Sequence, residues 1–516
     1  MLRRLLRRKD PGKTGKSPID NTNRVSKKPK NSVKYIHEAL SDCCDLETRT
    51  VRLGRNSKTN AHILFIDGMV DSSFVSQNIL KPLMMLETKD AGKQDLYGDI
   101  CNELLPVGTA TVEKTPDSLI MKVLSGNVGI LVEGLENFLA VEAIGWEERR
   151  VEESKAETVV KGMRSSFIES LRVNRSLIRR IIRHPKLKIE KITLGRLTNT
   201  EINIFYMQGI VMKGLVDEVK ERLDRIDVDG IIGLSSIQET IDDSRFSIFS
   251  SSYSTERPDR ACSCLLEGRV VIMMDNSPFA VVVPSIVAHL FQSPEDYNTK
   301  YITTSIIRLL RFVGLISTLL LPGLYVAIFS YHHEMIPIEL LNTVSLSREQ
   351  LPFPIFLEML MLEVTFEILR EAGIRLPRPV GQIISFVGAV VIGQATVAAR
   401  LVSPPSIIIV ALTAIASFTV PIVEGGNAIR MLRFPVLFAA GTFGLPGIVS
   451  VLLLILIHLS GLRSFGVPYL SPISPFALSD WKDLFIRVPM SFMKTRSVQT
   501  GKANLRRRGR WKQGDS

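Results

Sequence analysis

Five charged side chains interrupt an apolar stretch at residues 352–373, which reads PFPIFLEMLMLEVTFEILREAG. Glu363, Glu367 and Glu371 recur every four residues, so they share one face of a helix, and Arg370 lies beside them. Carboxylates at membrane depth are costly and usually face a bundle interior or water. Rings of carboxylates in a pore attract cations and repel anions. This spacing therefore makes cation handling the first chemistry to consider.

Two interpretations of this helix are open. In one, it is an amphipathic helix that lies flat at a membrane surface, and its glutamates pair with nearby arginines. The candidate charge partners are Arg370, Arg375 and Arg378. In the other, the helix lines a water-filled path, and Glu363 and Glu367 form stacked carboxylate rings in a symmetric oligomer. Glu358 lies about 140° around the helix from Glu363, so it adds a ring only if the helix tilts or rotates.

The elements that must position this helix are long apolar runs. Residues 312–331, 380–399 and 434–459 are each long enough to cross a bilayer, and 407–423 is just short of the length required. Soluble domains rarely contain uncharged runs of this length. We therefore predict an α-helical transmembrane domain over residues 301–462, with about four spans and the charged helix as a non-spanning element.

Both ends of the chain are basic. Residues 1–30 hold eleven Lys or Arg against two Asp, and residues 487–516 hold nine against one Asp. Basic segments beside membrane spans favour the cytoplasmic side and attract anionic lipid. We predict a disordered basic tail over 1–31 and a cytoplasmic basic tail over 463–516, with both termini cytoplasmic. No module typical of nucleic-acid binding lies between them.

Basic residues inside the helical region also bear on orientation. Arg308 and Arg311 precede the first apolar run and place that side in the cytoplasm. The short basic loops expected at 375–378 and 430–433 would prefer the same side if the charged helix crossed. With the charged helix as a further span, the chain would cross the membrane five times and the C-terminal tail would lie outside. Because both basic tails favour the cytoplasm, we predict four crossings.

The soluble part resembles a repeat. The segments HILFIDGMVD and INIFYMQGIVM share a strand, a Gly and a following helix. Later, SGNVGILVEGLENFLAVEA and EGRVVIMMDNSPFAVVVPS share two apolar strands joined at a tight turn. We predict two tandem, similar α/β subdomains over 32–148 and 195–300, joined by a charged helical connector over 149–194.

Several kinds of site are not indicated. The five cysteines form neither a disulfide framework nor a metal-ligand pattern, which predicts free thiols. The sequence contains no phosphate-binding loop, nucleophile elbow or catalytic triad. The N-terminus is basic but lacks the apolar run of a signal peptide. We therefore expect no cofactor, no metal and no enzymatic activity.

Several stretches together resemble the A subunits of spore germinant receptors, the GerA family, and the resemblance covers about residues 35–490. They are 255–260 (TERPDR), 266–269 (LEGR), 291–297 (FQSPEDY), 352–355 (PFPI), 366–393 (FEILREAGIRLPRPVGQIISFVGAVVIG), 401–421 (LVSPPSIIIVALTAIASFTVP) and 462–475 (LRSFGVPYLSPISP). The stretch 424–430 (EGGNAIR) departs from the expected pattern, and its glycines predict a different loop geometry.

The resemblance implies a subunit of the inner spore membrane with a two-part cytoplasmic N-terminal domain. Such A subunits act with a transporter-like B subunit that senses small nutrients and with a lipoprotein C subunit. The family implies a homo-oligomer that forms a nutrient-gated cation channel and triggers germination. The related stage V sporulation protein AF, an accessory ion channel, fits the same residues and is the first alternative.

Two further classes of function compete. Pro322, Pro404, Pro405 and Pro446 would break helices as in secondary transporters, although no inverted repeat is present. Saturable flux of one defined solute would favour a transporter. A scaffold subunit, whose soluble domain assembles partners while the helices only anchor it, would leave an intact complex that never conducts.

Overall fold

The computed structural model describes residues 29–53, 59–85, 110–145, 157, 159, 161–244, 246–349, 351–376, 393–477, 479–497 and 504–507. The chain forms two compact units, which are described separately. The first contains Met1–Trp146 and Arg183–Pro185, and the second contains Glu147–Ile182 and Lys186–Ser516. Most of the tail predicted over 1–31 and most of the apolar run 380–399 lie outside the described residues.

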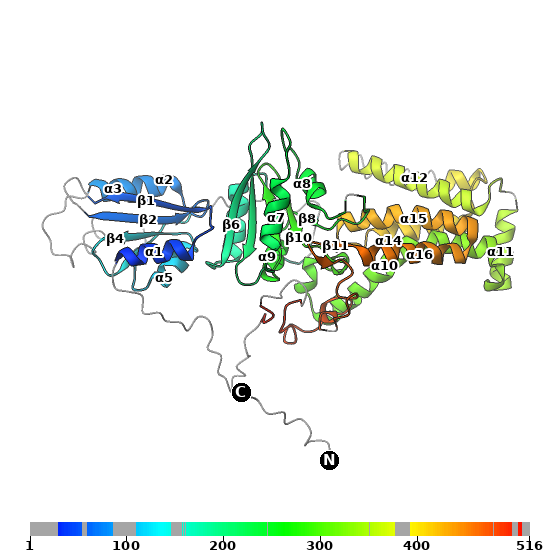
Figure 1. Cartoon of the computed structure of the whole chain (residues 1–516). Coiled ribbons are helices and arrows are strands. Elements are labelled where there is room, and N and C mark those ends of the chain that lie inside the picture. Colours follow the sequence, from blue (N-terminus) through cyan, green and yellow to red (C-terminus); the bar gives the residue numbers. More distant parts are fainter. Residues whose placement is uncertain are drawn as a thin grey trace, which may run out of the picture. The chain divides into compact units, whose positions relative to one another are not determined.

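The first unit contains a five-stranded antiparallel sheet with the order β1-β2-β4-β5-β3. Its strands are β1 (Leu46–Arg52), β2 (Asn60–Ile66), β3 (Ala110–Glu113), β4 (Asn127–Val132) and β5 (Phe138–Glu142). Its helices are α1 (Pro29–Ala39), α2 (Ser72–Phe74), η1 (Val75–Leu80), α3 (Lys81–Met85) and α5 (Pro116–Val123). Helices α2 and α3 lie on one face of the sheet and α1 and α5 on the other (Figure 1).

Strand β2 shows why both faces of this sheet are covered. Successive side chains of a strand point to opposite faces. Ile63 and Phe65 pack in the cluster that includes α3, whereas Leu64 and Ile66 pack in the cluster that includes α1 and α5. The continuous apolar run of β2 therefore produces a strand that is buried on both sides.

The second unit begins with a sheet of the same design. Its strand order is β6-β7-β9-β10-β8, and neighbouring strands are antiparallel. The strands are β6 (Leu187–Leu194), β7 (Thr200–Met207), β8 (Tyr253–Thr255), β9 (Val270–Met274) and β10 (Ala280–Val283). The helices are α6 (Leu171–Ile181), α7 (Leu215–Asp224), α8 (Leu234–Ile241) and α9 (Pro258–Leu266), with turns η2 (Val287–Leu290) and η3 (Pro294–Tyr297).

The two sheets have equivalent strand orders, as the predicted repeat requires. Strands β1 to β5 correspond in order to β6 to β10, and both sheets place the third strand at the edge beside the fifth. The start of the second subdomain differs from the prediction. Strand β6 pairs along its whole length with β7, so residues 187–194 belong to the sheet and not to a connector. The charges of LKIEKITL masked a strand whose first three residues, Leu187, Lys188 and Ile189, are all buried.

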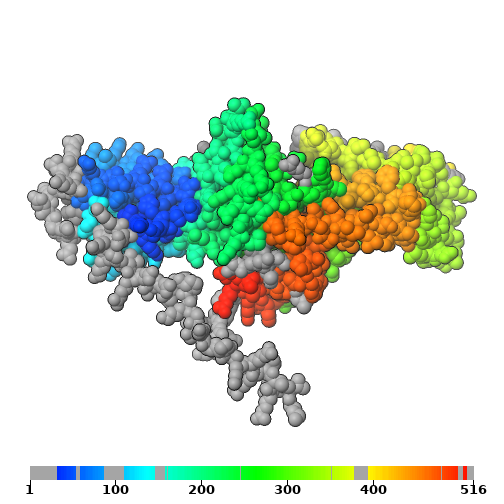
Figure 2. All heavy atoms as spheres, viewed as in Figure 1, coloured from blue at the N-terminus to red at the C-terminus, as the bar shows by residue number. Residues whose placement is uncertain are grey.

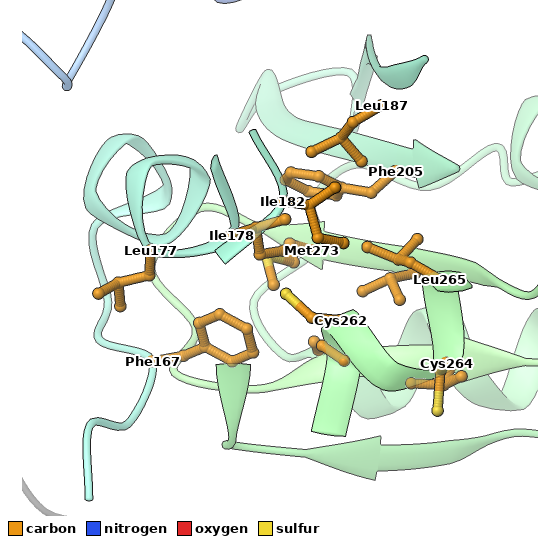
Figure 3. Packing of buried hydrophobic residues seen from close by; sticks show 14 of the residues in the cluster. Phe167, Leu177, Ile178, Ile182, Leu187, Phe205, Cys262, Cys264, Leu265 and Met273 are labelled. Carbon is orange, nitrogen blue, oxygen red and sulfur yellow. The ribbon is translucent and has the colours of Figure 1, made fainter. Parts of the chain in front are cut away.

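One core of this subdomain lies between the sheet and helices α6 and α9. Phe167 and Ile178 from the α6 side meet Leu265 of α9 and Phe205 and Met273 of the sheet (Figure 3). Cys262 also points into this cluster, where burial raises the pKa of its thiol, whereas the sulfur of Cys264 points away from Cys262 and contacts the Tyr253 hydroxyl. Among the cysteines that the structure describes, the buried Cys262 and Cys264 have free thiols, as predicted.

A helical region follows the second sheet. Its helices are α10 (Tyr301–Tyr331), α11 (Ile338–Arg348), α12 (Ile355–Arg375), α14 (Pro404–Ser417), α15 (Val423–Phe443) and α16 (Leu445–Gly461), with a turn η4 (His333–Met335). Helix α10 packs against α14, α15 and α16, and α12 lies along α14 and α15 (Figure 1). A short hairpin of β11 (Arg463–Ser464) and β12 (Val467–Pro468) and the turn η5 (Trp481–Asp483) then return to the second sheet.

Among the described residues, α10 is long and apolar enough to cross a membrane. It has 31 residues and contains the first predicted run. Helices α14 and α16 are apolar but shorter, with 14 and 17 residues. Helix α14 covers most of the run predicted at 407–423.

The run predicted at 434–459 is not one span. Helix α15 ends at Phe443 and α16 begins at Leu445, and the two helices pack against each other. Gly444 between them has φ 67° and ψ −143°, which a residue with a side chain rarely adopts. Pro446 follows in the first turn of α16, where its missing N–H is tolerated. The prediction of a basic loop at 430–433 is also wrong, because those residues lie inside α15.

Candidate functional site: buried charge clusters of the helical region

The predicted carboxylates lie on α12. Pro354 is the N-cap of this helix and disfavours a helical conformation at the residue before it, which fixes where the helix begins. Glu358 and Glu363 are fully buried, and the side chain of Glu367 exposes 30% of its surface. Carboxylates buried to this extent need partners, because transfer of an unpaired charge out of water is very costly.

Glu363 and Glu367 share one partner, Arg433 of α15. An Arg433 nitrogen lies 2.9 Å from an oxygen of each glutamate, and the Arg433 side chain is 1% exposed. We call Glu363, Glu367 and Arg433 the helix cluster. It joins the charged face of α12 to the middle of α15, within the hairpin that Gly444 creates.

The helix cluster is incompletely hydrogen-bonded. Neither carboxylate oxygen of Glu363 accepts a hydrogen bond from any residue that the structure describes. Within the same described residues, Nε and Nη1 of Arg433 donate none. Buried polar atoms in proteins are nearly always satisfied by protein groups, water or ions. The open valences of Glu363 are therefore suited to a water molecule or a cation.

Glu358 belongs to a separate and better-bonded set. One of its oxygens accepts hydrogen bonds from the backbone N–H and the hydroxyl of Ser403, and the other pairs with Arg348 at the end of α11. Ser406 extends this set to the hydroxyl of Tyr325 on α10. Glu358 thus connects α11 and α12 to the segment before α14, at a place distinct from the helix cluster.

The predicted charge partners have more local contacts. Arg370 lies 3.7 Å from Glu367 on the same helix. Arg375 donates to Glu371 at 2.6 Å, and both side chains are mostly exposed. Arg378 lies outside the described residues. Sequence reasoning missed Arg433, because the basic residues at 430–433 were assigned to a loop between spans.

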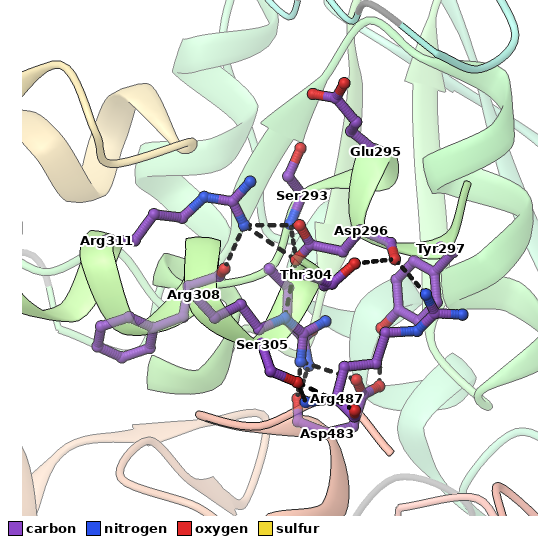
Figure 4. A network of polar contacts seen from close by, with 12 residues as sticks. Ser293, Glu295, Asp296, Tyr297, Thr304, Ser305, Arg308, Arg311, Asp483 and Arg487 are labelled. Atoms are coloured by element: carbon purple, nitrogen blue, oxygen red, sulfur yellow. Dashed lines mark hydrogen bonds and ion pairs between the residues drawn. The ribbon is translucent and has the colours of Figure 1, made fainter. Parts of the chain in front are cut away.

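A second set of charges surrounds the start of α10. Asp296 of η3 accepts from Arg308 at 2.8 Å and from Arg311 at 2.8 Å, and Arg308 also donates to Asp483 at 2.8 Å (Figure 4). Arg487 donates to the backbone carbonyl of Asp296 at 2.6 Å. We call Asp296, Arg308, Arg311, Asp483 and Arg487 the junction cluster. It joins the second subdomain, α10 and the C-terminal segment.

The carboxylates of the junction cluster are fully engaged. Both oxygens of Asp296 accept from guanidinium groups, and one also accepts from the backbone N–H of Ser293. Asp483 accepts from Arg308 with one oxygen and from the Tyr297 hydroxyl with the other, at 2.7 Å. Burial and the charge of Asp483 raise the pKa of Tyr297 well above its usual range.

The start of α15 contacts the second sheet. Glu424 accepts hydrogen bonds from the backbone N–H and the hydroxyl of Ser254 in β8. A Cβ at Gly425 would lie 2.1 Å from the end of the Leu290 side chain, so a larger residue here requires Leu290 to shift. Residues 424–430, which depart from the family pattern, therefore begin a helix at an interdomain contact. Figure 2 shows the green second subdomain lying directly against the orange helices.

Both clusters consist of ion pairs and hydrogen bonds between charged side chains. Within the part of the chain that the structure describes, they do not form an arrangement typical of covalent catalysis. Among the described residues, no group of three or more His, Cys, Asp or Glu could hold a metal ion. The junction cluster can transmit force between the sheet and α10, because it joins them through buried ion pairs. The helix cluster places incompletely bonded carboxylate oxygens between apolar helices, 2.9 Å from the guanidinium that neutralises them.

Comparisons with known proteins agree on one family. The family model described as Bacillus/Clostridium GerA spore germination protein matches residues 34–499. Spore germination protein KA of Bacillus subtilis (strain 168) is 39% identical over 481 residues, covering 93% of this chain and 88% of that protein. The uncharacterized membrane protein YfkQ of the same organism is 36% identical, covering 94% of each chain.

A solved structure is also similar to about half of this chain. It is the crystal structure of the N-terminal domain of the A subunit of the Bacillus megaterium spore germinant receptor GerK3. Its sequence is 27% identical, and the match has a TM-score of 0.42 and covers 51% of this chain and 96% of that domain.

Proposed function

Because the chain belongs to the GerA family of spore germination proteins, we propose that it is the A-type membrane subunit of a nutrient germinant receptor. In this proposal it forms a homo-oligomer in the inner spore membrane and opens a path for cations when a nutrient binds the complex. Family membership itself places the chain among germination proteins and not among enzymes, as the sequence predicted.

Exposed apolar side chains support insertion of the helical region in a membrane. On α10, Leu309, Leu310 and Val313 each expose more than half of their surface, and Leu453, Leu454 and Ile457 do so on α16. Apolar surfaces of this extent fit lipid or partner helices. The relative YfkQ is named a membrane protein. We propose a multi-pass arrangement with both termini in the cytoplasm, where the basic tails meet anionic lipid.

The observation that carries the cation path is the unsatisfied carboxylate of Glu363. Both of its oxygens are buried and accept no hydrogen bond within the described residues, although Arg433 neutralises much of its charge. Such a group can exchange its arginine partner for a cation and water when the helices move. In a symmetric oligomer, Glu363 and Glu367 would repeat as rings around the axis. Glu358 could add a further ring only after release from Arg348 and Ser403.

Partners follow from the resemblance to receptor A subunits. We propose a transporter-like B subunit as the nutrient sensor and a lipoprotein C subunit as a further component, with no role for nucleic acid. The junction cluster supports coupling between the second subdomain and α10, since it joins both to the C-terminal segment. A stage V sporulation-type accessory channel remains the alternative, and adjacent permease-like and lipoprotein genes would instead indicate a receptor operon.

A secondary transporter is favoured by one observation. The helix break at Gly444 and Pro446 forms a hairpin within the apolar region, and such breaks are used by transporters at their binding sites. Saturable flux of one solute would support this function, whereas triggered release of several monovalent cations would support the channel. A complex that assembles but never conducts would identify a scaffold.

The test measures nutrient-triggered cation release from spores that carry single or paired substitutions. Glu363→Gln should abolish most of the release at unchanged protein level and assembly. Glu371→Gln is the matched control, because Glu371 lies on the same helix but is mostly exposed and pairs only locally in the described structure.

A double substitution separates conduction from folding. Glu363→Gln with Arg433→Met removes both fully buried charges, and Glu367, which loses Arg433, is 30% exposed and keeps Arg370 at 3.7 Å. If the carboxylate conducts, release stays lost in the double variant although the complex assembles. If release returns to the wild-type level, the pair is only structural and the cation path lies elsewhere.

A further inference from the structure

A cavity of about 170 Å³ lies on the second subdomain, next to α9, β9 and the turns η2 and η3. Its wall includes residues from three stretches that carry the family resemblance, namely 255–260, 266–269 and 291–297. Arg507 of the C-terminal segment also lines it. Three separate parts of the subdomain and the end of the chain thus converge on one small space that the proposed cation path does not use.

Arg269 lines this cavity with an incompletely bonded guanidinium. The side chain is 3% exposed, and its Nε donates no hydrogen bond to any residue that the structure describes. Its closest carboxylate oxygen, on Glu267, lies 3.4 Å away, which is longer than the roughly 2.8 Å of a charge-assisted hydrogen bond. Nη1 faces the imidazole of His289. The buried guanidinium thus has a neutral ring nitrogen as its close acceptor but no carboxylate at the distance of a charge-assisted hydrogen bond.

Other cationic groups stand beside Arg269. The Arg260 side chain is 8% exposed, and its guanidinium lies 4.9 Å from the centre of the Tyr253 ring. Burial and the charges of Arg269 and Arg260 hold the pKa of His289 well below its usual range, so the imidazole stays neutral. Arg507 adds a third guanidinium, with 30% of its side chain exposed.

The acidic residues near the cavity are already engaged. Asp259 accepts two hydrogen bonds from Arg257, at 2.7 and 3.1 Å. Glu157 accepts from Arg260 at 3.0 Å. Glu267 is shared between Arg269 and Arg507, at 3.4 and 3.8 Å. The cavity therefore contains donors that its own carboxylates do not fully satisfy.

We propose that this cavity binds a small oxyanion, the phosphate or carboxylate group of a free small molecule. The planar guanidinium of Arg269 can donate two parallel hydrogen bonds to such a group. Asn298, Ser263 and Gln292 line the same space and provide further polar contacts. The volume is well below the roughly 300–1,000 Å³ of drug-sized pockets, which favours a compact ligand. This site does not depend on the proposed cation path.

The experiment measures thermal unfolding of the full chain in detergent micelles with increasing inorganic phosphate. Ionic strength is held constant with chloride, so that general screening does not change. A ligand that binds the folded state raises the unfolding temperature in proportion to its occupancy. The wild type should show a saturable rise with phosphate. A parallel series with acetate decides whether the site accepts carboxylates or only phosphates.

Substitutions locate the binding. Arg269→Gln should weaken phosphate binding about tenfold or more, since a charge-assisted bond is lost. Arg507→Gln, at the more exposed edge of the cavity, keeps the test valid if Arg269→Gln does not fold, and should weaken binding several-fold. Arg225→Gln is the control, because Arg225 is mostly exposed on the same subdomain and pairs with Glu221. No rise with either anion, or equal rises in wild type and both cavity variants, would overturn the proposal.

Discussion

The two buried charge clusters of the second unit differ in how their carboxylates are bonded. In the junction cluster, every carboxylate oxygen of Asp296 and Asp483 accepts a hydrogen bond. In the helix cluster, Glu363 lies as close to Arg433 but accepts none within the described residues. The cluster whose carboxylates are fully bonded is suited to hold elements in place, although Nη2 of Arg308 and Nε of Arg487 donate no hydrogen bond within the described residues. The incompletely bonded one is suited to exchange partners, which is what a regulated ion path requires.

The largest expected effect comes from Asp296→Asn. The substitution leaves Arg308 and Arg311 facing a neutral group in a buried site, which should lower the free energy of unfolding by ~3–5 kcal/mol. Chemical unfolding of the purified chain in micelles measures it. Asp227→Asn breaks an exposed pair with Arg196 and should cost less than ~1 kcal/mol. If the two substitutions lowered the free energy of unfolding equally, the junction cluster would stabilise the fold no more than an exposed ion pair does.

A smaller loss of stability is expected from Glu363→Gln, because Glu367 still pairs with Arg433. The double variant Glu363→Gln with Arg433→Met should recover most of the stability, since well-packed apolar groups often replace buried ion pairs without loss. The same unfolding measurement applies. If Glu363→Gln costs as much as Asp296→Asn, the two clusters do not differ in the way their hydrogen bonds indicate.

The contact between the two regions gives the next prediction. Gly425→Ala places a methyl group 2.1 Å from the Leu290 side chain and should cost ~1–3 kcal/mol. Gly426→Ala, one residue later in α15, meets nothing closer than 4.0 Å and should stabilise the helix by up to ~1 kcal/mol. Opposite signs in the unfolding temperature would confirm close packing of α15 on the second subdomain, and like signs would contradict it.

The smallest effect concerns pH. The pKa of His289 is well below its usual value in the folded chain, so below about pH 6.5 the unfolded state binds a proton that the folded state does not. Stability should be unaffected by His289 above that pH and should fall at lower pH, by up to ~1.4 kcal/mol per pH unit. His289→Phe should flatten this slope, whereas His37→Gln on the exposed face of α1 should not. An unchanged slope in His289→Phe would show that the imidazole is protonated in the folded state.

The sequence predicted the repeat because local patterns specify it. Strands β2, β4, β7 and β9 are each an apolar run followed by a turn. These local patterns indicate where the strands lie and in what order they follow along the chain. The sequence pattern placed the start of the second subdomain at residue 195, after β6. The charges of LKIEKITL favoured a connector, although Leu187 and Ile189 are buried in the sheet. Burial of one face needs only every second residue to be apolar, so charge density alone is a poor guide to strands.

The long apolar run at 434–459 was interpreted by length alone. Gly444 and Pro446 were visible, but their effect depends on whether the chain can reverse there and pack α16 against α15. Once the run is divided, Arg433 lies on a helix and not in a loop. The position of the helix cluster could therefore not be predicted without the hairpin.

By itself the sequence determined the two-part α/β region, the apolar helices and the carboxylates of α12, because composition and periodicity record burial locally, and its motifs carried the resemblance to the family. Only the tertiary structure decided which charges meet. Glu363 lies 70 residues before Arg433, and Asp296 and Asp483 converge on Arg308 from distant segments. Ion pairs form wherever packing brings opposite charges into a low-dielectric space. Their partners are therefore a property of the folded chain and not of sequence spacing.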